Sequence, residues 1–210
     1  TRVFRGGQHG SRFPLIPGYE NVGEIIDVGP DTVLETGDLV FVQGHQYDAQ
    51  GRELLWGSQV SHSLASENAV IPVPESVDAA QAVFAKVSAI SLHGVKRARV
   101  KSGEWVVVVG LGLIGHFVVQ HAAARGAHVI AADMSPERLQ MAAAGGADHT
   151  VNVAETDLAG EVMRLTEGGA DLCFDATGRP DTLDPSAQLL RHRPWDTDPA
   201  EVSRLVIQGS

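Results

Sequence analysis

Residues 105–115 read WVVVVGLGLIG, and this stretch decides the fold of the chain. Residues 106–109 form an apolar, β-branched run that is typical of a strand buried on both faces. Gly110, Gly112 and Gly115 follow in the spacing Gly-x-Gly-x-x-Gly. The first glycine permits a tight turn, the second lets a pyrophosphate approach the backbone, and the third lets a helix lie close to the strand. The stretch therefore predicts a strand, a phosphate-binding turn and a helix.

A second strand is predicted over residues 127–132, and Asp133 follows it. Asp133 stands eighteen positions after Gly115, close to the offset of roughly 20 residues at which a carboxylate meets the adenosine ribose of a dinucleotide. A carboxylate accepts hydrogen bonds from the ribose hydroxyls of NAD and repels the 2′-phosphate of NADP, so NAD(H) is the predicted cofactor. Arg138 either turns toward a phosphate, contacts the ribose or remains solvated. The alternative is a structural crossover in which Asp133 only caps a helix.

The composition restricts the possible partners. With 210 residues, 43% of them hydrophobic, the chain can build one large or two small domains. A net charge of −10 argues against nucleic acid or an anionic membrane and favours a small molecule. The longest apolar run is interrupted by glycines and is too short for a membrane span. Cys173 is the only cysteine, which excludes an intramolecular disulfide and a multi-cysteine zinc site. A cytoplasmic setting fits this composition.

The sequence pattern changes near residues 74–80. Short alternating runs at 22–28 and 39–42, separated by turn residues, predict a β module over residues 1–76. Strands alternating with helices then predict a parallel sheet over residues 77–210, with later strands at 149–152, 171–176 and 204–208. Because a complete dinucleotide fold commonly has one strand more, and because the first residue is Thr1, both domains are expected to be incomplete at the chain ends. Residues 190–204 are expected to form a surface excursion.

Four stretches together, residues 13–42, 106–115, 131–139 and 171–178, resemble the medium-chain dehydrogenase/reductase family, which the zinc alcohol dehydrogenases typify. The resemblance covers nearly the whole chain. It implies an α/β architecture in which a GroES-like catalytic β module precedes a doubly wound Rossmann sheet, with the active site in the cleft between them. It also implies hydride transfer between a nicotinamide ring and a carbonyl or alcohol, and a homodimer.

The same resemblance assigns the cofactor-binding residues. Leu113 and Ile114 would offer backbone amides to the pyrophosphate, and Asp133 and Arg138 would meet the adenosine ribose. Ala176, Thr177 and Gly178 would lie near the nicotinamide ribose.

The chain departs from the zinc-dependent members at their metal ligands. Those members carry Gly-His-Glu where this chain reads Gly18-Tyr19-Glu20, and Ala85 stands where they place a ligand cysteine. Only Glu20 survives as a candidate ligand, and catalytic zinc normally takes about three protein ligands. The short loop 44–52 takes the place of the structural zinc lobe. These differences predict a zinc-independent branch with no metal site, in which residues 17–20 are most similar to the bacteriochlorophyllide a dehydrogenase-type subgroup.

Without a metal, another group must stabilise the negative charge that develops on a carbonyl oxygen. Tyr19, Glu20 and Lys86 are therefore the candidate catalytic residues: Tyr19 could donate its phenolic proton, and Lys86 could assist the phenol or polarise the carbonyl. Ser88 is a further possibility. The alternative is that Tyr19 only fills the volume of the metal and that Lys86 pairs with Glu20. His45, His62 and Trp56 lie near the loop and are read either as cleft residues or as ordinary surface and core residues.

Two other functions remain open at this point. The same fold could reduce an activated C=C bond, as quinone and enoyl reductases of the family do, with less need for a proton donor at oxygen. The chain could also be a non-catalytic homologue that retains only nucleotide binding, or a fragment of a longer enzyme.

Overall fold

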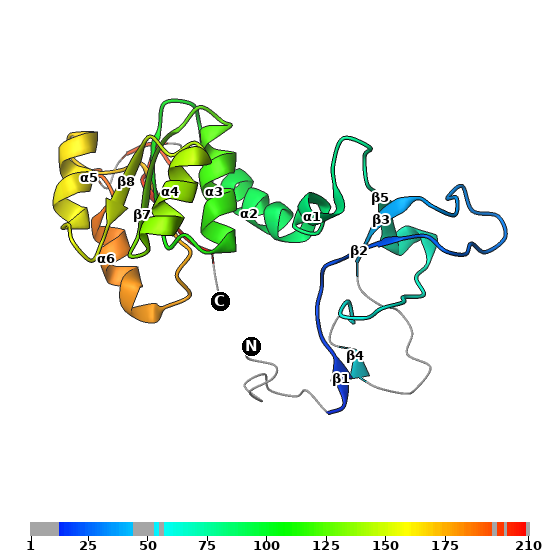
Figure 1. Ribbon diagram of the computed structural model, residues 1–210. Coiled ribbons are helices and arrows are strands. Elements are labelled where there is room, and N and C mark those ends of the chain that lie inside the picture. The colour runs from blue at the N-terminus through cyan, green and yellow to red at the C-terminus, as the bar shows by residue number, and fades with distance from the viewer. Residues whose placement is uncertain (1–12, 44–52, 55–56, 195–196, 200, 209–210) are drawn as a thin grey trace. The chain divides into compact units, whose positions relative to one another are not determined.

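The structure is a computed structural model that describes residues 13–43, 53–54, 57–194, 197–199 and 201–208. The chain divides into two units, Thr1–Lys86 and Val87–Ser210, and each is described by itself (Figure 1). The division falls within helix α2 (Ala85–Arg97). No helix in the described part of the chain combines the length and apolarity that crossing a membrane requires.

The first unit contains two small sheets. Strands β2 (Asn21–Glu24), β3 (Leu39–Val42) and β5 (Val70–Pro72) form an antiparallel sheet in the order β2-β3-β5, and β1 (Leu15–Ile16) pairs in parallel with β4 (Glu53–Leu54). A short 3₁₀ helix, η1 (Glu67–Ala69), precedes β5. Helix α1 (Ala79–Ala82) begins at Asp78, whose carboxylate accepts a hydrogen bond from the Gln81 N–H. The β character predicted for this part of the chain is confirmed in its described residues.

Strand β2 is shorter than the predicted run 22–28. Its last pair joins Glu24 to Leu39, and only one further pair of backbone hydrogen bonds follows, made by Ile25 with Gly37 and Asp38. Beyond Ile25 the turn that precedes β3 offers no strand partner, so Ile26 is 69% exposed. The alternating apolar pattern therefore continues past the point at which pairing ends.

The second unit is built on a five-stranded parallel sheet, as the sequence predicts. The strands are β6 (Trp105–Val109), β7 (His128–Asp133), β8 (His149–Asn152), β9 (Leu172–Asp175) and β10 (Arg204–Ile207), and their order is β10-β9-β6-β7-β8. The helices are α3 (Leu113–Ala123), α4 (Pro136–Ala144), α5 (Leu158–Thr166) and α6 (Leu183–Gln188), with a 3₁₀ turn η2 at Pro180–Thr182. The strand order reverses between β6 and β9, and open α/β sheets bind ligands at the carboxyl ends of the strands beside such a point.

Both faces of this sheet are covered, which explains the unbroken apolar run in β6. Val106 and Val108 pack in one cluster with Val118 of α3 and Ala142 of α4. Val107 faces the opposite cluster, which contains Val162 of α5 and Cys173. The three central residues of β6 are therefore each buried against one of two helical layers, and the doubly wound arrangement is confirmed (Figure 1).

The connection between residues 190 and 204 is anchored to the sheet at its start. The Arg191 N–H donates to the Ala170 carbonyl at 2.8 Å, and the Arg193 guanidinium donates to Asp171 at 3.0 Å. Gly169 (φ +110°) lies so close to this segment that a Cβ on it would approach the Arg191 backbone to 2.6 Å. The contact between the Arg191 backbone and Gly169 therefore positions the connection between residues 190 and 204. The described residues of this connection form no helix and no strand before β10.

We expect Gly169→Ala to destabilise the second unit more than Gly168→Ala does. Both glycines have positive φ, so each alanine introduces backbone strain of about 1–3 kcal/mol. At Gly168 only the Arg191 side chain lies nearby, at 3.8 Å, whereas at Gly169 the Arg191 backbone must also move, which adds roughly 1–3 kcal/mol. Urea denaturation of the two variants measures the difference. Equal free energies of unfolding would contradict the close approach at Gly169.

Candidate functional site

The turn after β6 brings three segments together at the reversal point of the sheet. Gly110 has φ +88°, and its N–H donates to the Ala132 carbonyl at 2.9 Å. A Cβ on Gly110 would lie 2.9 Å from the Thr177 side chain and 3.0 Å from the Thr177 backbone nitrogen. A Cβ on Gly115 would collide with the Gly110 carbonyl oxygen. The first and third glycines thus stand where only a hydrogen atom fits, and the loop after β9 contacts the loop after β6.

The middle glycine begins helix α3 and borders open space. Gly112 is the N-cap residue, and no side chain in the described part of the chain accepts a hydrogen bond from the first turn there. No described atom lies within 4 Å of the position that a Cβ would take on Gly112. The first N–H groups of a helix lack intrahelical partners and lie at the positive end of its dipole. The amides of this turn, including those of Leu113 and Ile114, therefore form a site that suits an anion.

Asp133 closes this site from the end of β7. Its side chain is 6% exposed, and its carboxylate accepts hydrogen bonds from the Leu111 N–H at 2.7 Å and the Ser135 N–H at 2.9 Å. The Arg138 guanidinium lies 3.5 Å away. Burial acts to raise the pKa of Asp133, but these hydrogen bonds and the charge of Arg138 outweigh burial and hold the pKa below its ordinary value. Asp133 is therefore ionised at neutral pH. Its Oδ2 accepts from both the Leu111 N–H and, at 3.5 Å, the Arg138 guanidinium, so a further hydroxyl donor would replace this longer bond.

A second buried carboxylate, Asp175, fixes the loop that contains Ala176, Thr177 and Gly178. Asp175 is 1% exposed and ends β9 beside Val109. Its carboxylate accepts hydrogen bonds from the Thr177 N–H at 3.0 Å and from three hydroxyls, those of Thr177 at 2.7 Å, Thr182 at 2.7 Å and Ser186 at 3.0 Å. Burial acts to raise the pKa of Asp175, and these bonds together lower it below its ordinary value.

Sequence reasoning did not single out Asp175. The available signal was an acid at the end of the apolar run LCFD, followed by small hydroxyl residues. Which hydroxyls converge on the carboxylate is decided by the fold, because Thr182 and Ser186 reach it from η2 and α6. The structure thus adds a residue that holds the 176–178 loop against the glycine turn.

The candidate catalytic residues lie in the first unit, where two of them are in contact. The Lys86 ammonium lies over the Tyr19 ring, 5.2 Å from the ring centroid, a geometry typical of a cation–π interaction. The preceding turn is held in place because the Ser58 N–H donates to the Gly18 carbonyl at 2.9 Å. Glu20 follows Tyr19 and is half-buried. The structure therefore brings Tyr19 and Lys86 together, at a cation–π distance.

The remaining candidates have other surroundings. Ser88 belongs to the second unit, where its hydroxyl lies 3.1 Å from the His121 ring nitrogen. His62 is exposed and contacts the Ser61 hydroxyl at 3.2 Å. His45, Trp56 and the loop 44–52 lie outside the described residues. Ser88 and His62 thus belong to different units, each beside a hydrogen-bonding partner.

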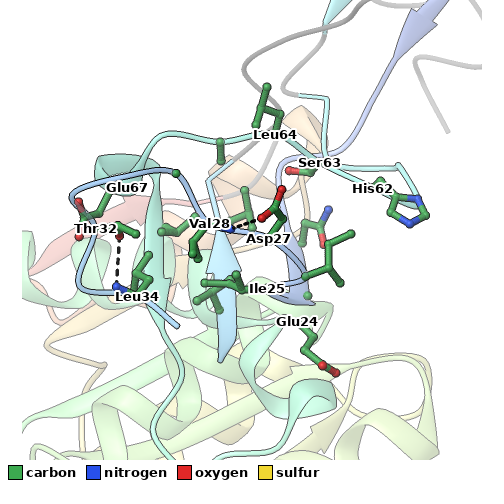
Figure 2. A pocket seen from close by; sticks show the side chains of 18 of the residues that line it. Glu24, Ile25, Asp27, Val28, Thr32, Leu34, His62, Ser63, Leu64 and Glu67 are labelled. Atoms are coloured by element: carbon green, nitrogen blue, oxygen red, sulfur yellow. Dashed lines mark hydrogen bonds between the residues drawn. The ribbon is translucent and has the colours of Figure 1, made fainter. Parts of the chain in front are cut away.

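A cavity of about 500 Å³ lies in the first unit, beside β2 (Figure 2). Its lining combines aliphatic side chains, among them Ile25, Leu34 and Leu64, with acids that include Asp27, whose carboxylate accepts a hydrogen bond from the Val28 N–H. Tyr19, Glu20 and Lys86 are not among the residues that line it. The cavity is therefore separate from the candidate catalytic residues.

In residues 13–43, 57–194, 197–199 and 201–208, no three His, Cys, Asp or Glu side chains come together in a way that could hold a metal ion. At the position of the family's ligand histidine, Tyr19 instead lies under the Lys86 ammonium, whose charge opposes binding of a dication. Zinc is normally bound by Cys, His, Asp or Glu side chains, and neither Tyr19 nor Lys86 is one of these.

Comparison with known proteins gives two domain matches. Residues 1–75 match the family described as alcohol dehydrogenase GroES-like domain, and residues 114–193 match the family described as zinc-binding dehydrogenase. The expected combination of a GroES-like module with a Rossmann-like parallel sheet is confirmed.

Individual relatives are dehydrogenases. An alcohol dehydrogenase of Rhizobium meliloti is 32% identical over 200 residues, which cover 86% of this chain and 58% of that protein. An erythritol/L-threitol dehydrogenase of Mycolicibacterium smegmatis is 30% identical over 84% of this chain and 56% of its own length. The crystal structure of 2R,3R-butanediol dehydrogenase from Bacillus subtilis superposes with a TM-score of 0.73 at 26% identity, covering 95% of this chain and 66% of that one. The chain thus spans little more than half the length of these curated relatives.

We expect Asp175→Asn to weaken NADH binding. An amide nitrogen cannot accept the bonds that now reach the carboxylate, so the 176–178 loop loosens and the dissociation constant rises about tenfold. Because the folded-state pKa is lowered, the stability that Asp175 contributes is present above its unfolded pKa of about 3.9 and is lost as the pH falls through the folded pKa. The stability difference between wild type and variant should therefore shrink below about pH 4. NADH fluorescence titration and acid unfolding provide the two measurements.

Asp171→Asn is the matched control for this experiment. Asp171 precedes β9 at the opposite end of the strand, where it accepts hydrogen bonds from the Trp105 N–H and from Arg193. Its replacement should lower stability and leave NADH affinity unchanged. Equal effects of the two variants on affinity would contradict the positioning role of Asp175.

Proposed function

Because the chain belongs to the alcohol dehydrogenase-like medium-chain dehydrogenase/reductase family, we propose that it is an NAD(H)-dependent oxidoreductase. It moves a hydride between the nicotinamide ring and the carbonyl or alcohol carbon of a small molecule. The observation that carries the proposal is the glycine turn at the reversal point of the sheet. There, an uncapped helix start and a buried carboxylate, Asp133, lie at one edge.

The residues at this edge fit the dinucleotide. The amides of Leu113 and Ile114 would hold the pyrophosphate beside the open space at Gly112. Asp133 would accept hydrogen bonds from the ribose hydroxyls in place of the 3.5 Å bond from Arg138, and Arg138 would lie beside it. Ala176, Thr177 and Gly178 would border the nicotinamide ribose. When bound, NAD(H) supplies the hydride or accepts it.

The proton chemistry falls to the first unit in this proposal. Carbonyl reduction places negative charge on oxygen, and the Tyr19 phenol would donate a proton to that atom. The Lys86 ammonium, 5.2 Å from the ring centroid, would stabilise the negative charge that develops on the phenol. Glu20 would contribute a carboxylate next to Tyr19. The proposed reaction needs no zinc, because Tyr19 and Ala85 stand at two positions where the zinc-dependent members carry metal ligands, and because Lys86 adds a positive charge there.

The names of the relatives guide the choice of substrate. Erythritol and butanediol, for which two of these proteins are named, both contain vicinal hydroxyl groups. We therefore place small vicinal diols and α-hydroxyketones first among the substrates to test. Quinones and enones test the alternative of C=C reduction, and a bacteriochlorophyllide-type substrate tests the subgroup that residues 17–20 suggest. A cytoplasmic homodimer completes the proposal.

We expect the chain to bind NADH about tenfold more tightly than NADPH, a difference of about 1.4 kcal/mol. Asp133→Asn should reduce this preference, because a neutral amide no longer repels the 2′-phosphate. Parallel fluorescence titrations with the two nucleotides measure it. Asp148→Asn serves as the control, since Asp148 also accepts a backbone hydrogen bond, from the Val129 N–H, but precedes β8. Binding of neither nucleotide would overturn the proposed function.

We also expect Tyr19→Phe to lower turnover of a carbonyl substrate by about 10²-fold, because the variant lacks the proton donor. NADH affinity should remain that of the wild type, which shows that the variant is folded. Steady-state oxidation of NADH with the best substrate of the panel provides the measurement. Unchanged turnover would exclude the phenol as the acid and would favour the alternative of C=C reduction.

A further inference from the structure

The sulfur chemistry of this chain is concentrated in its methionines. The chain has one cysteine and three methionines. Cys173 is fully buried in the sheet, and burial raises the pKa of its thiol to about 12. Because the thiolate is the reactive form, Cys173 is inert toward peroxides in the folded protein. A thioether needs no deprotonation, so exposed methionines are the residues that a peroxide reaches first.

All three methionines are exposed, and one of them adjoins the proposed nucleotide site. Met134 is 69% exposed, Met141 62% and Met163 38%. Met134 directly follows Asp133 at the carboxyl end of β7, and the Asp133–Ser135 hydrogen bond spans it at 2.9 Å. Met141 lies within α4 and Met163 within α5. The large apolar side chain of Met134 is thus exposed to solvent at the carboxyl end of β7, where the ribose of the dinucleotide is proposed to bind.

We propose that Met134 is an oxidation site through which a peroxide weakens dinucleotide binding; this rests on the proposed function. In a bound dinucleotide the adenine is joined to the ribose whose hydroxyls would donate hydrogen bonds to Asp133. The side chain of the next residue, Met134, would therefore lie beside the base. Thioethers make favourable contacts with aromatic rings. Nucleotide binding therefore uses the unoxidised side chain.

The reaction needs only the peroxide. The thioether sulfur attacks one peroxide oxygen, the O–O bond breaks, and a sulfoxide S–O bond forms while the peroxide is reduced to water or an alcohol. The product is a polar, chiral side chain in place of a flexible apolar one. Its oxygen carries partial negative charge on the residue that directly follows Asp133. Methionine sulfoxide reductases reverse the change, so the loss of affinity is reversible.

The test compares NADH affinity before and after hydrogen peroxide in the wild-type chain and in two variants, Met134→Leu and Met141→Leu. Mass spectrometry of peptides identifies which methionine has gained an oxygen atom. In the wild type we expect the dissociation constant to rise about fivefold as Met134 is oxidised and to recover after reductase treatment. Met134→Leu should bind NADH after peroxide as it does before. Met141→Leu, which removes a methionine of similar exposure, should lose affinity as the wild type does.

Three outcomes would overturn the inference. Oxidation of Met134 without a change in affinity would do so, as would an equal loss of affinity in Met134→Leu. These first two outcomes leave the proposed function intact, because in each of them the untreated chain binds NADH. Absence of saturable binding before peroxide would overturn the proposed function and the inference together.

Discussion

The close approach of Gly110 and Gly115 is the constraint on which the second unit depends. Only glycine at position 115 lets α3 start against the carbonyl of Gly110, and only glycine at position 110 lets the loop after β9 touch the turn. The helix then begins at the reversal point of the sheet with its amides uncapped by any described side chain. The backbone geometry that allows the sheet to pack thus also creates the anion site, without a basic side chain.

Two buried carboxylates stabilise this arrangement from neighbouring strands. Asp133 joins the glycine turn to the start of α4 through the Leu111 and Ser135 amides, and Asp175 joins β9 to η2 and α6. Burying a charge is costly unless hydrogen bonds compensate for it. In both residues the hydrogen bonds outweigh the cost of burial, since both pKa values are lowered. The carboxyl ends of β7 and β9 therefore hold two fixed negative charges, which would face the hydroxyl groups of a dinucleotide. The start of α3 offers positive potential, which would face its phosphates.

The first unit holds a different kind of site. Its turn at Gly18 lies beside Tyr19, whose ring lies under the Lys86 ammonium. In the proposed function this pair would serve proton donation to the substrate oxygen. The cavity beside β2 is a separate feature of this unit, and it is lined by aliphatic side chains together with acids that include Asp27.

The sequence by itself determined the elements that local pattern controls. The glycine spacing predicted the turn after β6, and the apolar runs predicted four further parallel strands. It could not show where β2 stops, because pairing with Leu39 and not alternation ends that strand. It could not find the bonds to Asp175, nor the contact of Gly169 with Arg191, because these join residues of different elements whose approach the fold decides. Periodicity and turn chemistry are local properties, whereas the convergence of hydroxyls and amides on a buried carboxylate exists only after the sheet has assembled.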